Sequence, residues 1–242
     1  MFNKIALINK STVLGTSDMT SIAAACSLQV SRDFSPAWGK LAIPVEYVVS
    51  EASVPSTSAR IYIFNDADQS GALGYHTETI GGQVYGKVFA RTILNYGIPI
   101  LYSAGAPNSI TVSSVVSHEV LELLGNPFVD LWADGPVYNG CSEYAYEMCD
   151  AVESNAYGVN ITVPRGNRGS MSLRVSVSNF LYPQYFDTAT PSGTRMDYMG
   201  LITAPYTMSS GGYMIIRNPS GSEIAVFGAN YPDVLRSINP HK

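Results

Sequence analysis

Hydrophobic and polar positions in the first part of the chain alternate between the period of a strand and the period of a helix. Between residues 19 and 30, apolar side chains recur every three to four positions, which predicts a helix capped near Ser17 and Asp18. The Ser35-Pro36 pair should end that helix, since proline lacks the N–H that a helix interior needs. Apolar runs of strand length predict buried strands at residues 4–9, 41–50 and 58–66.

Two further segments complete the pattern of the first half. Polar residues interleave with apolar ones over residues 72–90, which favours an extended segment at a sheet edge with a bend at Gly81 and Gly82. Helical spacing returns over residues 113–124, where serines can cap the start and Gly125 with Pro127 can end the helix.

Beyond Pro127 the pattern becomes that of a β-rich region, with frequent glycine, asparagine and tyrosine. Residues 158–165 and 171–182 predict one hairpin, and residues 211–218 and 223–228 predict another. No linker separates these parts, so we expect one α+β domain over residues 1–242, with a mixed-sheet half at 1–127 and a β-rich half at 128–242.

Composition narrows the function classes. The 242 residues contain no apolar run near the ~20 residues of a membrane-spanning helix, and the apolar stretch at the start is too short for a signal peptide. A net charge of −5 disfavours nucleic acid as a partner. Only 14% of residues are charged, against roughly 25% in ordinary proteins, which suits either contact with protein partners or a tyrosine-rich β domain. Three cysteines without a CxxC pair favour reduced thiols, although a Cys141–Cys149 bridge stays open.

One apolar segment, SHEVLELLGNP, carries three ionisable residues. At 100° per residue, His118, Glu119 and Glu122 occupy a narrow arc of a helix that is otherwise covered by valine and leucine. His118 and Glu122 are four residues apart, so both side chains can reach one ion, while Glu119 points to its flank. Burying these groups without compensation would cost several kcal/mol. A metal ion is the compensation that this spacing favours.

The HEVLE sequence with the trailing Gly125 resembles the HExxHxxG stretch of zincin metallopeptidases, particularly the metzincins. The resemblance implies a zinc cofactor, with His118 as its first ligand and Glu119 as the general base. Glu122 stands where the family has its second histidine, and a carboxylate can also ligate zinc. The third ligand of the metzincin pattern would fall at Phe128, which cannot serve.

The order of the predicted elements is also similar to the N-terminal half of zincins. In that family an edge strand binds extended peptide beside the metal, which implies substrate binding at Gly74, Tyr75 and His76. A single histidine in a strand is more often a hydrogen-bonded structural residue than a substrate contact. The whole chain also resembles uncharacterised bacterial and phage proteins, a likeness that implies a cytoplasmic or virion location but no activity.

A second acidic cluster lies in EYAYEMCDAVE, residues 143–153. If the segment is helical, Glu143, Glu147 and Asp150 share one side, with Glu153 continuing the line. Thermolysin-like zincins take a third zinc ligand from a downstream glutamate with an aspartate one turn later, and Glu147 with Asp150 resembles that pair. The alternative is a solvated acidic surface.

Three functions remain open on these residues. The first is a metal-dependent peptidase acting on a peptide or protein substrate, with Glu119 as the base and a tyrosine as oxyanion donor. The second is a zincin-like structural or binding protein without turnover, such as a phage virion component with assembly partners and no metal. The third is a calcium-stabilised protein whose oxygen cage comes from Glu122, Glu147, Asp150 and Glu153. The candidate oxyanion donors are Tyr144, Tyr146 and Tyr198.

Overall fold

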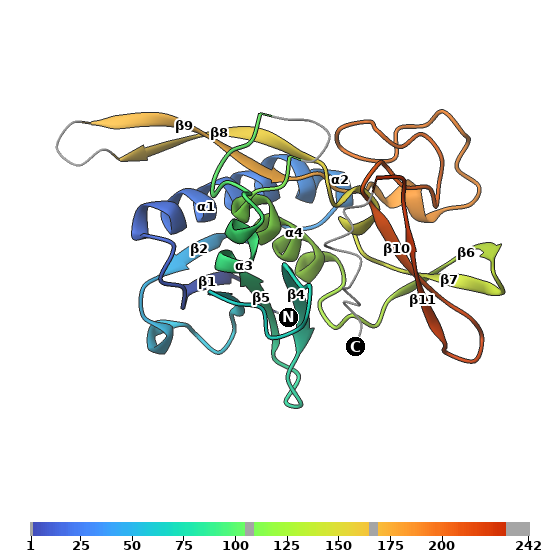
Figure 1. Cartoon of the computed structure of the whole chain (residues 1–242), viewed down its shortest axis with the longest axis horizontal. Coiled ribbons are helices and arrows are strands. Elements are labelled where there is room, and N and C mark those ends of the chain that lie inside the picture. The colour runs from blue at the N-terminus through green and yellow to red at the C-terminus, as the bar shows by residue number, and fades with distance from the viewer. Residues whose placement is uncertain (1, 105–108, 165–168, 231–242) are drawn as a thin grey trace.

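The computed structural model describes residues 2–104, 109–164 and 169–230, and it has an α+β fold (Figure 1). Strands and helices alternate in the first half, and strands dominate the second half. The elements are β1 (Ile5–Asn9), α1 (Thr16–Gln29), α2 (Ser35–Trp38), β2 (Val45–Val48), β3 (Ala59–Phe64), β4 (Gly74–Glu78), β5 (Val84–Phe89), α3 (Ala90–Asn95), α4 (Val112–Gly125), β6 (Trp132–Tyr138), β7 (Cys141–Ala145), β8 (Ala156–Pro164), β9 (Ser170–Ser178), β10 (Tyr213–Arg217) and β11 (Glu223–Phe227).

A five-stranded mixed sheet forms the base of the first half. Its strand order is β2-β1-β3-β5-β4, and every neighbouring pair is parallel except β4 with β5. The antiparallel β4 is therefore an edge strand, as the interleaved pattern of residues 72–90 predicts. The bend lies at the tight turn after β4, where Gly82 adopts a φ of +74° that suits glycine.

Two long helices cover one face of this sheet. Apolar side chains of α1 and α4, such as Ile22 and Val120, pack with Ile61 and Val88 of the sheet in one core cluster. Helix α4 also contacts α1 and β9, so it is enclosed on nearly every side (Figure 1). All its residues except Leu124 are buried, which explains why apolar residues cover its circumference apart from the arc of His118, Glu119 and Glu122.

The second half builds two antiparallel sheets. The β8–β9 hairpin lies over α1 and α4, where Val159 and Val177 pack against Ala25 of α1. Strands β11, β10, β7 and β6 form a four-stranded sheet in that order beside α4 (Figure 1). The three cysteines are free and buried. Among the described helices, none has the length and apolarity to cross a membrane.

The predicted end of the first helix is wrong. The first helix does not end at Ser35-Pro36, because a π-helical segment (Val30–Phe34) leads into α2, which ends at Gly39 with a φ of +59°. Pro36 falls in the first turn of α2, where a missing N–H costs nothing.

Residues 143–153 are not one helix. The first part is β7, which pairs with both β6 and β10, and a 3-10 turn (Asp150–Val152) follows a short connection. Long-range strand pairing thus overrides the helical spacing of the acidic residues. Glu143 lies on the sheet and pairs with Arg217 at 2.9 Å, away from the other carboxylates.

The end of α4 depends on a close contact between Gly125 and Met148. A Cβ atom at position 125 would overlap the Met148 sulfur, and the Met148 side chain is fully buried. The contact places the segment that carries Glu147 against the last turn of the helix.

We therefore expect Gly125→Ala to lower the free energy of unfolding by about 1–3 kcal/mol, because Met148 has no free volume into which it can move. Urea unfolding measures the change. Gly81→Ala is the control, since Gly81 is exposed and its nearest neighbour would be the Thr79 hydroxyl at 3.7 Å. Equal stability of the Gly125→Ala and parent proteins would contradict this packing.

Candidate metal centre

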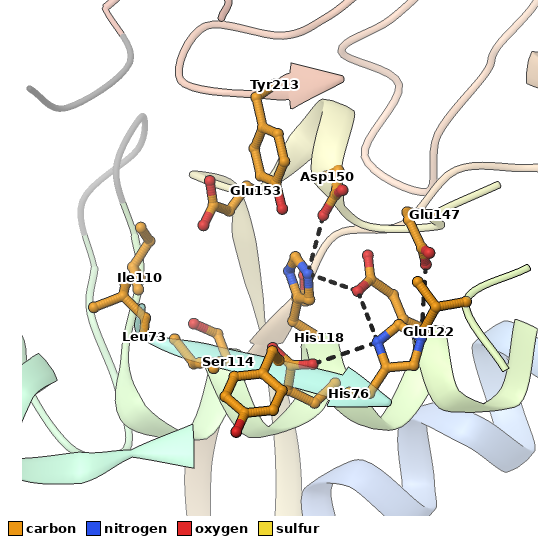
Figure 2. A pocket seen from close by; sticks show the side chains of 16 residues that line it. Leu73, His76, Ile110, Ser114, His118, Glu122, Glu147, Asp150, Glu153 and Tyr213 are labelled. Carbon is orange, nitrogen blue, oxygen red and sulfur yellow. Dashed lines mark ion pairs between the residues drawn. The ribbon is translucent and has the colours of Figure 1, made fainter. Parts of the chain in front are cut away.

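The eight residues expected as general base, metal ligands or substrate contacts on β4 lie around one small pocket of about 50 Å³ (Figure 2). The pocket is bounded by α4, by the edge strand β4 and by the segment that follows β7. Neither Glu147 nor Asp150 points into solvent, as each is only 4% exposed. The eight residues are Gly74, Tyr75, His76, His118, Glu119, Glu122, Glu147 and Asp150.

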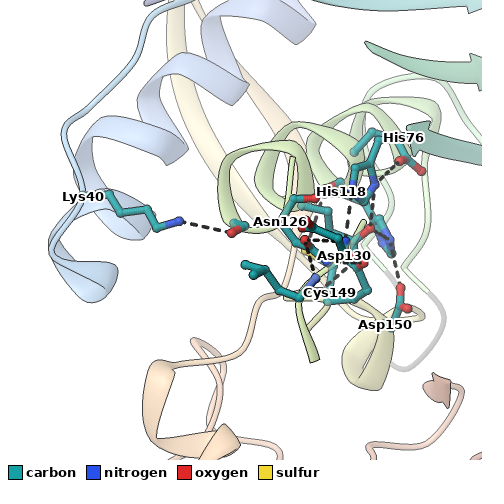
Figure 3. Close-up of polar contacts among 12 residues, drawn as sticks. Lys40, His76, His118, Asn126, Asp130, Cys149 and Asp150 are labelled. Carbon is teal, nitrogen blue, oxygen red and sulfur yellow. Dashed lines mark hydrogen bonds and ion pairs between the residues drawn. The ribbon is translucent and has the colours of Figure 1, made fainter. Parts of the chain in front are cut away.

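Both ends of α4 are fixed, which sets the position of its three ionisable residues. At the start, the Thr111 hydroxyl accepts a hydrogen bond from the Ser114 N–H, and the Ser114 hydroxyl accepts one from the Thr111 N–H. At the end, the Lys40 ammonium donates to the Leu124 carbonyl at 2.8 Å (Figure 3). A helix held at both ends presents His118 and Glu122 to the pocket with little freedom.

His118 lies between two carboxylates. Its Nε2 atom is 3.0 Å from Glu122 Oε2 and 3.2 Å from Asp150 Oδ1 (Figure 2). Burial disfavours a charged imidazole, but the negative charge of Glu122 and the hydrogen bond to Asp150 outweigh burial and raise the pKa of His118 well above its usual value. His118 Nε2 thus faces two carboxylate oxygens, which could share a metal ion with it.

His76 enters the same cluster from β4. Its Nε2 atom is 2.9 Å from the Asn126 carbonyl oxygen, and its Nδ1 atom is 3.6 Å from Glu122 Oε2 and 3.7 Å from Glu119 Oε2. Burial opposes the charged form, but the charge of Glu147 and of these two glutamates raises the pKa of His76 to about 10. His76 is therefore a member of the charged cluster rather than an isolated strand histidine.

Asn126, the residue after α4, organises one side of the pocket. Its side-chain amide donates to Glu147 Oε1 at 3.0 Å, and its side-chain oxygen accepts from the N–H groups of Asp130 and Leu131 (Figure 3). Its backbone carbonyl faces His76. One buried asparagine thereby fixes the positions of an imidazole and a carboxylate from two other segments.

Negative charge exceeds positive charge in this pocket. Its described lining contains five carboxylates and two imidazoles, and it contains no lysine or arginine. Burial and the charge of Asp150 raise the pKa of Glu122 to about 8, and burial raises the pKa of Glu147 well above its usual range. Glu119 Oε2 and Glu147 Oε2 are buried and accept no hydrogen bond within the described part of the chain. Such a donor set fits a divalent cation, which would replace the protons that the cluster otherwise retains.

Two sets of side chains could hold a metal ion. His118, Glu122 and Cys149 form one set, and His76, Glu122 and Glu147 form the other, with the ligand atoms of each set within 4.8 Å of one another. Glu122 belongs to both sets. Asp150 Oδ1 lies 3.2 Å from His118 Nε2, the same nitrogen that Glu122 faces, although Asp150 belongs to neither set.

Gly74 makes room for the Glu119 carboxylate. A Cβ atom at position 74 would lie 2.6 Å from Glu119 Oε1 and 3.0 Å from the Lys87 carbonyl oxygen, so a larger residue would displace that carboxylate. The Tyr75 side chain is held by Asp68, whose Oδ2 accepts from the tyrosine hydroxyl at 3.0 Å. Of the three β4 residues expected to bind substrate, His76 is the one whose side chain joins the charged cluster.

Among the described residues, no strand pairs with the outer edge of β4. Phe89 N–H donates to the Leu73 carbonyl and Thr79 N–H to the Gln83 carbonyl, so the odd-numbered residues of β4 bond to β5. The N–H and C=O groups of Gly74 and His76 therefore point to the free edge, beside the pocket.

Several residues in or beside the pocket were not identified from the sequence. Asn126 lies in a Gly-Asn-Pro stretch that is typical of a turn, and Cys149 has no partner at a metal-binding spacing. Tyr213 of β10 lines the pocket (Figure 2), whereas the three tyrosines expected as oxyanion donors do not line it. Tyr144 instead donates to the Pro136 carbonyl, and Tyr198 to Asp33.

Comparison with protein-family models, with curated proteins and with solved structures finds no match to this chain.

The raised pKa values predict how stability depends on pH in chelator-treated protein. Folding raises the pKa of Glu122 from 4.5 to about 8 and the pKa of His76 from 6.5 to about 10. Between about pH 5 and pH 9, the folded chain therefore binds more protons than the unfolded chain. The stability contributed by these protons is present at low pH and lost as pH rises. We expect the free energy of unfolding to fall across this range in urea titrations.

Glu147→Gln should flatten this decrease, because it removes one of the groups that take up a proton on folding. Glu143→Gln is the matched control, since Glu143 pairs with Arg217 at the sheet surface. A free energy of unfolding that rises between pH 5 and pH 9, or a slope unaffected by Glu147→Gln, would contradict the described electrostatics.

Proposed function

We propose that this protein is a metal-dependent peptidase. The observation that carries the proposal is the position of a buried, cation-deficient cluster of histidines and carboxylates directly beside an open sheet edge. Metal ligands alone would support only binding, and a free edge alone would support only strand addition. Their adjacency supports hydrolysis of an extended peptide, in agreement with the zincin resemblance of the HEVLE sequence.

Separate residues would bind the cation and accept the proton of the attacking water. His118 and Glu122 would hold the cation, with Cys149 in the same possible ligand set and Asp150 Oδ1 3.2 Å from the same His118 nitrogen. Glu147 belongs to the other set, with His76 and Glu122. When bound, the cation would supply Lewis acidity toward a peptide carbonyl and lower the pKa of a water molecule. Glu119 would accept the proton of the attacking water, since its Oε2 is buried at the pocket without a hydrogen-bond donor among the described residues.

The substrate would lie along β4 as an added strand. The outward N–H and C=O groups of Gly74 and His76 supply two positions for main-chain hydrogen bonds. A second groove of about 550 Å³ adjoins the pocket and shares Tyr75, His76 and Val129 with it. Its far wall includes Trp132 and Arg217, whose guanidinium stacks 4.0 Å from the indole ring. This groove gives the side chains of an extended peptide a place beside the cluster.

Zinc is the metal that this donor set favours. Calcium prefers oxygen ligands alone, whereas two imidazoles face this pocket and a buried thiol belongs to one of the possible ligand sets. Glu122 in place of a second histidine supports the other candidate function, a scaffold of zincin type that binds partners without turnover. The two functions differ in whether Glu119 has a chemical role.

Glu119→Gln should abolish peptide hydrolysis while leaving the metal content and the melting temperature of the protein nearly unchanged, because glutamine fills the same space but accepts no proton. His118→Ala should instead lose the metal and lower the melting temperature. Hydrolysis is measured on a quenched-fluorescence peptide library, and metal content by mass spectrometry of the purified protein.

Glu78→Gln, at the exposed end of β4, is the control for a changed carboxylate outside the pocket. Equal cleavage by the Glu119→Gln and parent proteins would refute the peptidase mechanism. A metal-loaded parent protein that cleaves no member of the library would favour the scaffold without turnover.

A further inference from the structure

We propose that the pocket binds two divalent cations, with Glu122 bridging a His118 position and a second position formed by His76, Glu122 and Glu147. The inference rests on the metal-dependent function proposed above and changes the role of His76 from substrate contact to metal ligand. Zinc is the cation to which we commit, because each position offers one imidazole and at least one carboxylate.

The orientation of His76 is that of a ligand. A metal-binding histidine usually donates its second ring N–H to a backbone carbonyl or a carboxylate, which fixes the tautomer and aims the other nitrogen. His76 Nε2 has such a partner in the Asn126 carbonyl at 2.9 Å. The lone pair of Nδ1 is thereby directed at Glu122 Oε2 and Glu119 Oε2, at 3.6 and 3.7 Å.

Glu147 has one carboxylate oxygen that is held in place by its neighbours but accepts no hydrogen bond from the described residues. Its Oε1 accepts a hydrogen bond from the Asn126 amide, which fixes the carboxylate. Its Oε2 is buried and accepts no hydrogen bond from the described residues, and Glu147 belongs with His76 and Glu122 to a set whose ligand atoms lie within 4.8 Å of one another. In a residue that is only 4% exposed, such an oxygen requires compensation by a proton or by a cation.

Glu122 is placed to bridge the two positions. Its Oε1 accepts from the Cys149 N–H at 3.2 Å, while its Oε2 lies 3.0 Å from His118 Nε2 and 3.6 Å from His76 Nδ1. Ligand atoms around a tetrahedral zinc ion with ~2.0 Å bonds lie roughly 3.3 Å apart, close to both distances. The two histidines do not share one set of ligand atoms, so the geometry favours two neighbouring ions over one.

The charge balance also favours two cations. Five carboxylates and two imidazoles line the pocket, with no lysine or arginine among the described lining residues, so the pocket can accept the charge of a second cation. Two-metal sites place their ions about 3.5–4 Å apart, a spacing that a shared carboxylate can span.

The test is the metal stoichiometry of the full-length protein. After removal of metal by a chelator, the protein is titrated with Zn²⁺, and bound zinc is measured by mass spectrometry and calorimetry. We expect two equivalents per chain. Saturation at one equivalent would overturn the second position and leave the proposed function intact, whereas no bound metal would overturn both.

His76→Ala and Glu147→Gln should each reduce the content from two equivalents to one, with the remaining ion lost on His118→Ala. Glu78→Gln is the matched control and should keep two equivalents. Two equivalents in the folded His76→Ala protein, with folding checked by circular dichroism, would overturn the assignment.

A measurement on the parent protein alone keeps the test independent of variant folding. Two Mn²⁺ ions that share the Glu122 carboxylate should be magnetically coupled, so the six-line electron paramagnetic resonance signal should weaken as the second equivalent binds. A signal that doubles instead would mean two isolated ions and would overturn the bridge.

Discussion

Compensation of buried negative charge is the constraint on which this structure depends. Helix α4 lies in the centre of the molecule, yet it carries Glu119 and Glu122 into a pocket that also receives Glu147 and Asp150. His118 and His76 are the only described residues lining it whose side chains can carry a positive charge. Each burial of a carboxylate opposes folding, so the contacts that assemble the pocket must be matched by protons or by a cation. Folding is therefore coupled to the uptake of protons or, as we propose, to the binding of a cation.

The local pattern of apolar and polar residues was enough to predict the helix and the edge strand that line the pocket. Helical spacing with capping serines predicted α4, and interleaved polarity predicted the edge strand β4. Local patterns failed where distant segments decide the structure. The acidic spacing would suit a helix around Glu147, but pairing with the distant β10 and with the adjacent β6 makes the preceding residues a strand. Pro36 ends no helix, since it falls in a first turn that tolerates it.

The same division holds for the site. Spacing placed His118, Glu119 and Glu122 on one arc, and a family resemblance singled out Glu147 and Asp150, all of which line the pocket. The place of His76 in the charged cluster could not be derived from the sequence, because only the three-dimensional structure places its strand against α4. The role of Asn126 depends on three partners from separate segments, which no spacing within its own segment indicates.

Anomalous X-ray diffraction at the zinc edge from crystals of the metal-loaded protein tests the central claim most directly. The account predicts an anomalous peak about 2.0–2.2 Å from His118 Nε2 and a Glu122 oxygen, in the space between α4 and β4. The absence of any peak in the pocket, with His118 still in direct contact with Glu122 and Asp150 at full zinc loading, would contradict the claim. Protons alone would then compensate the buried charge.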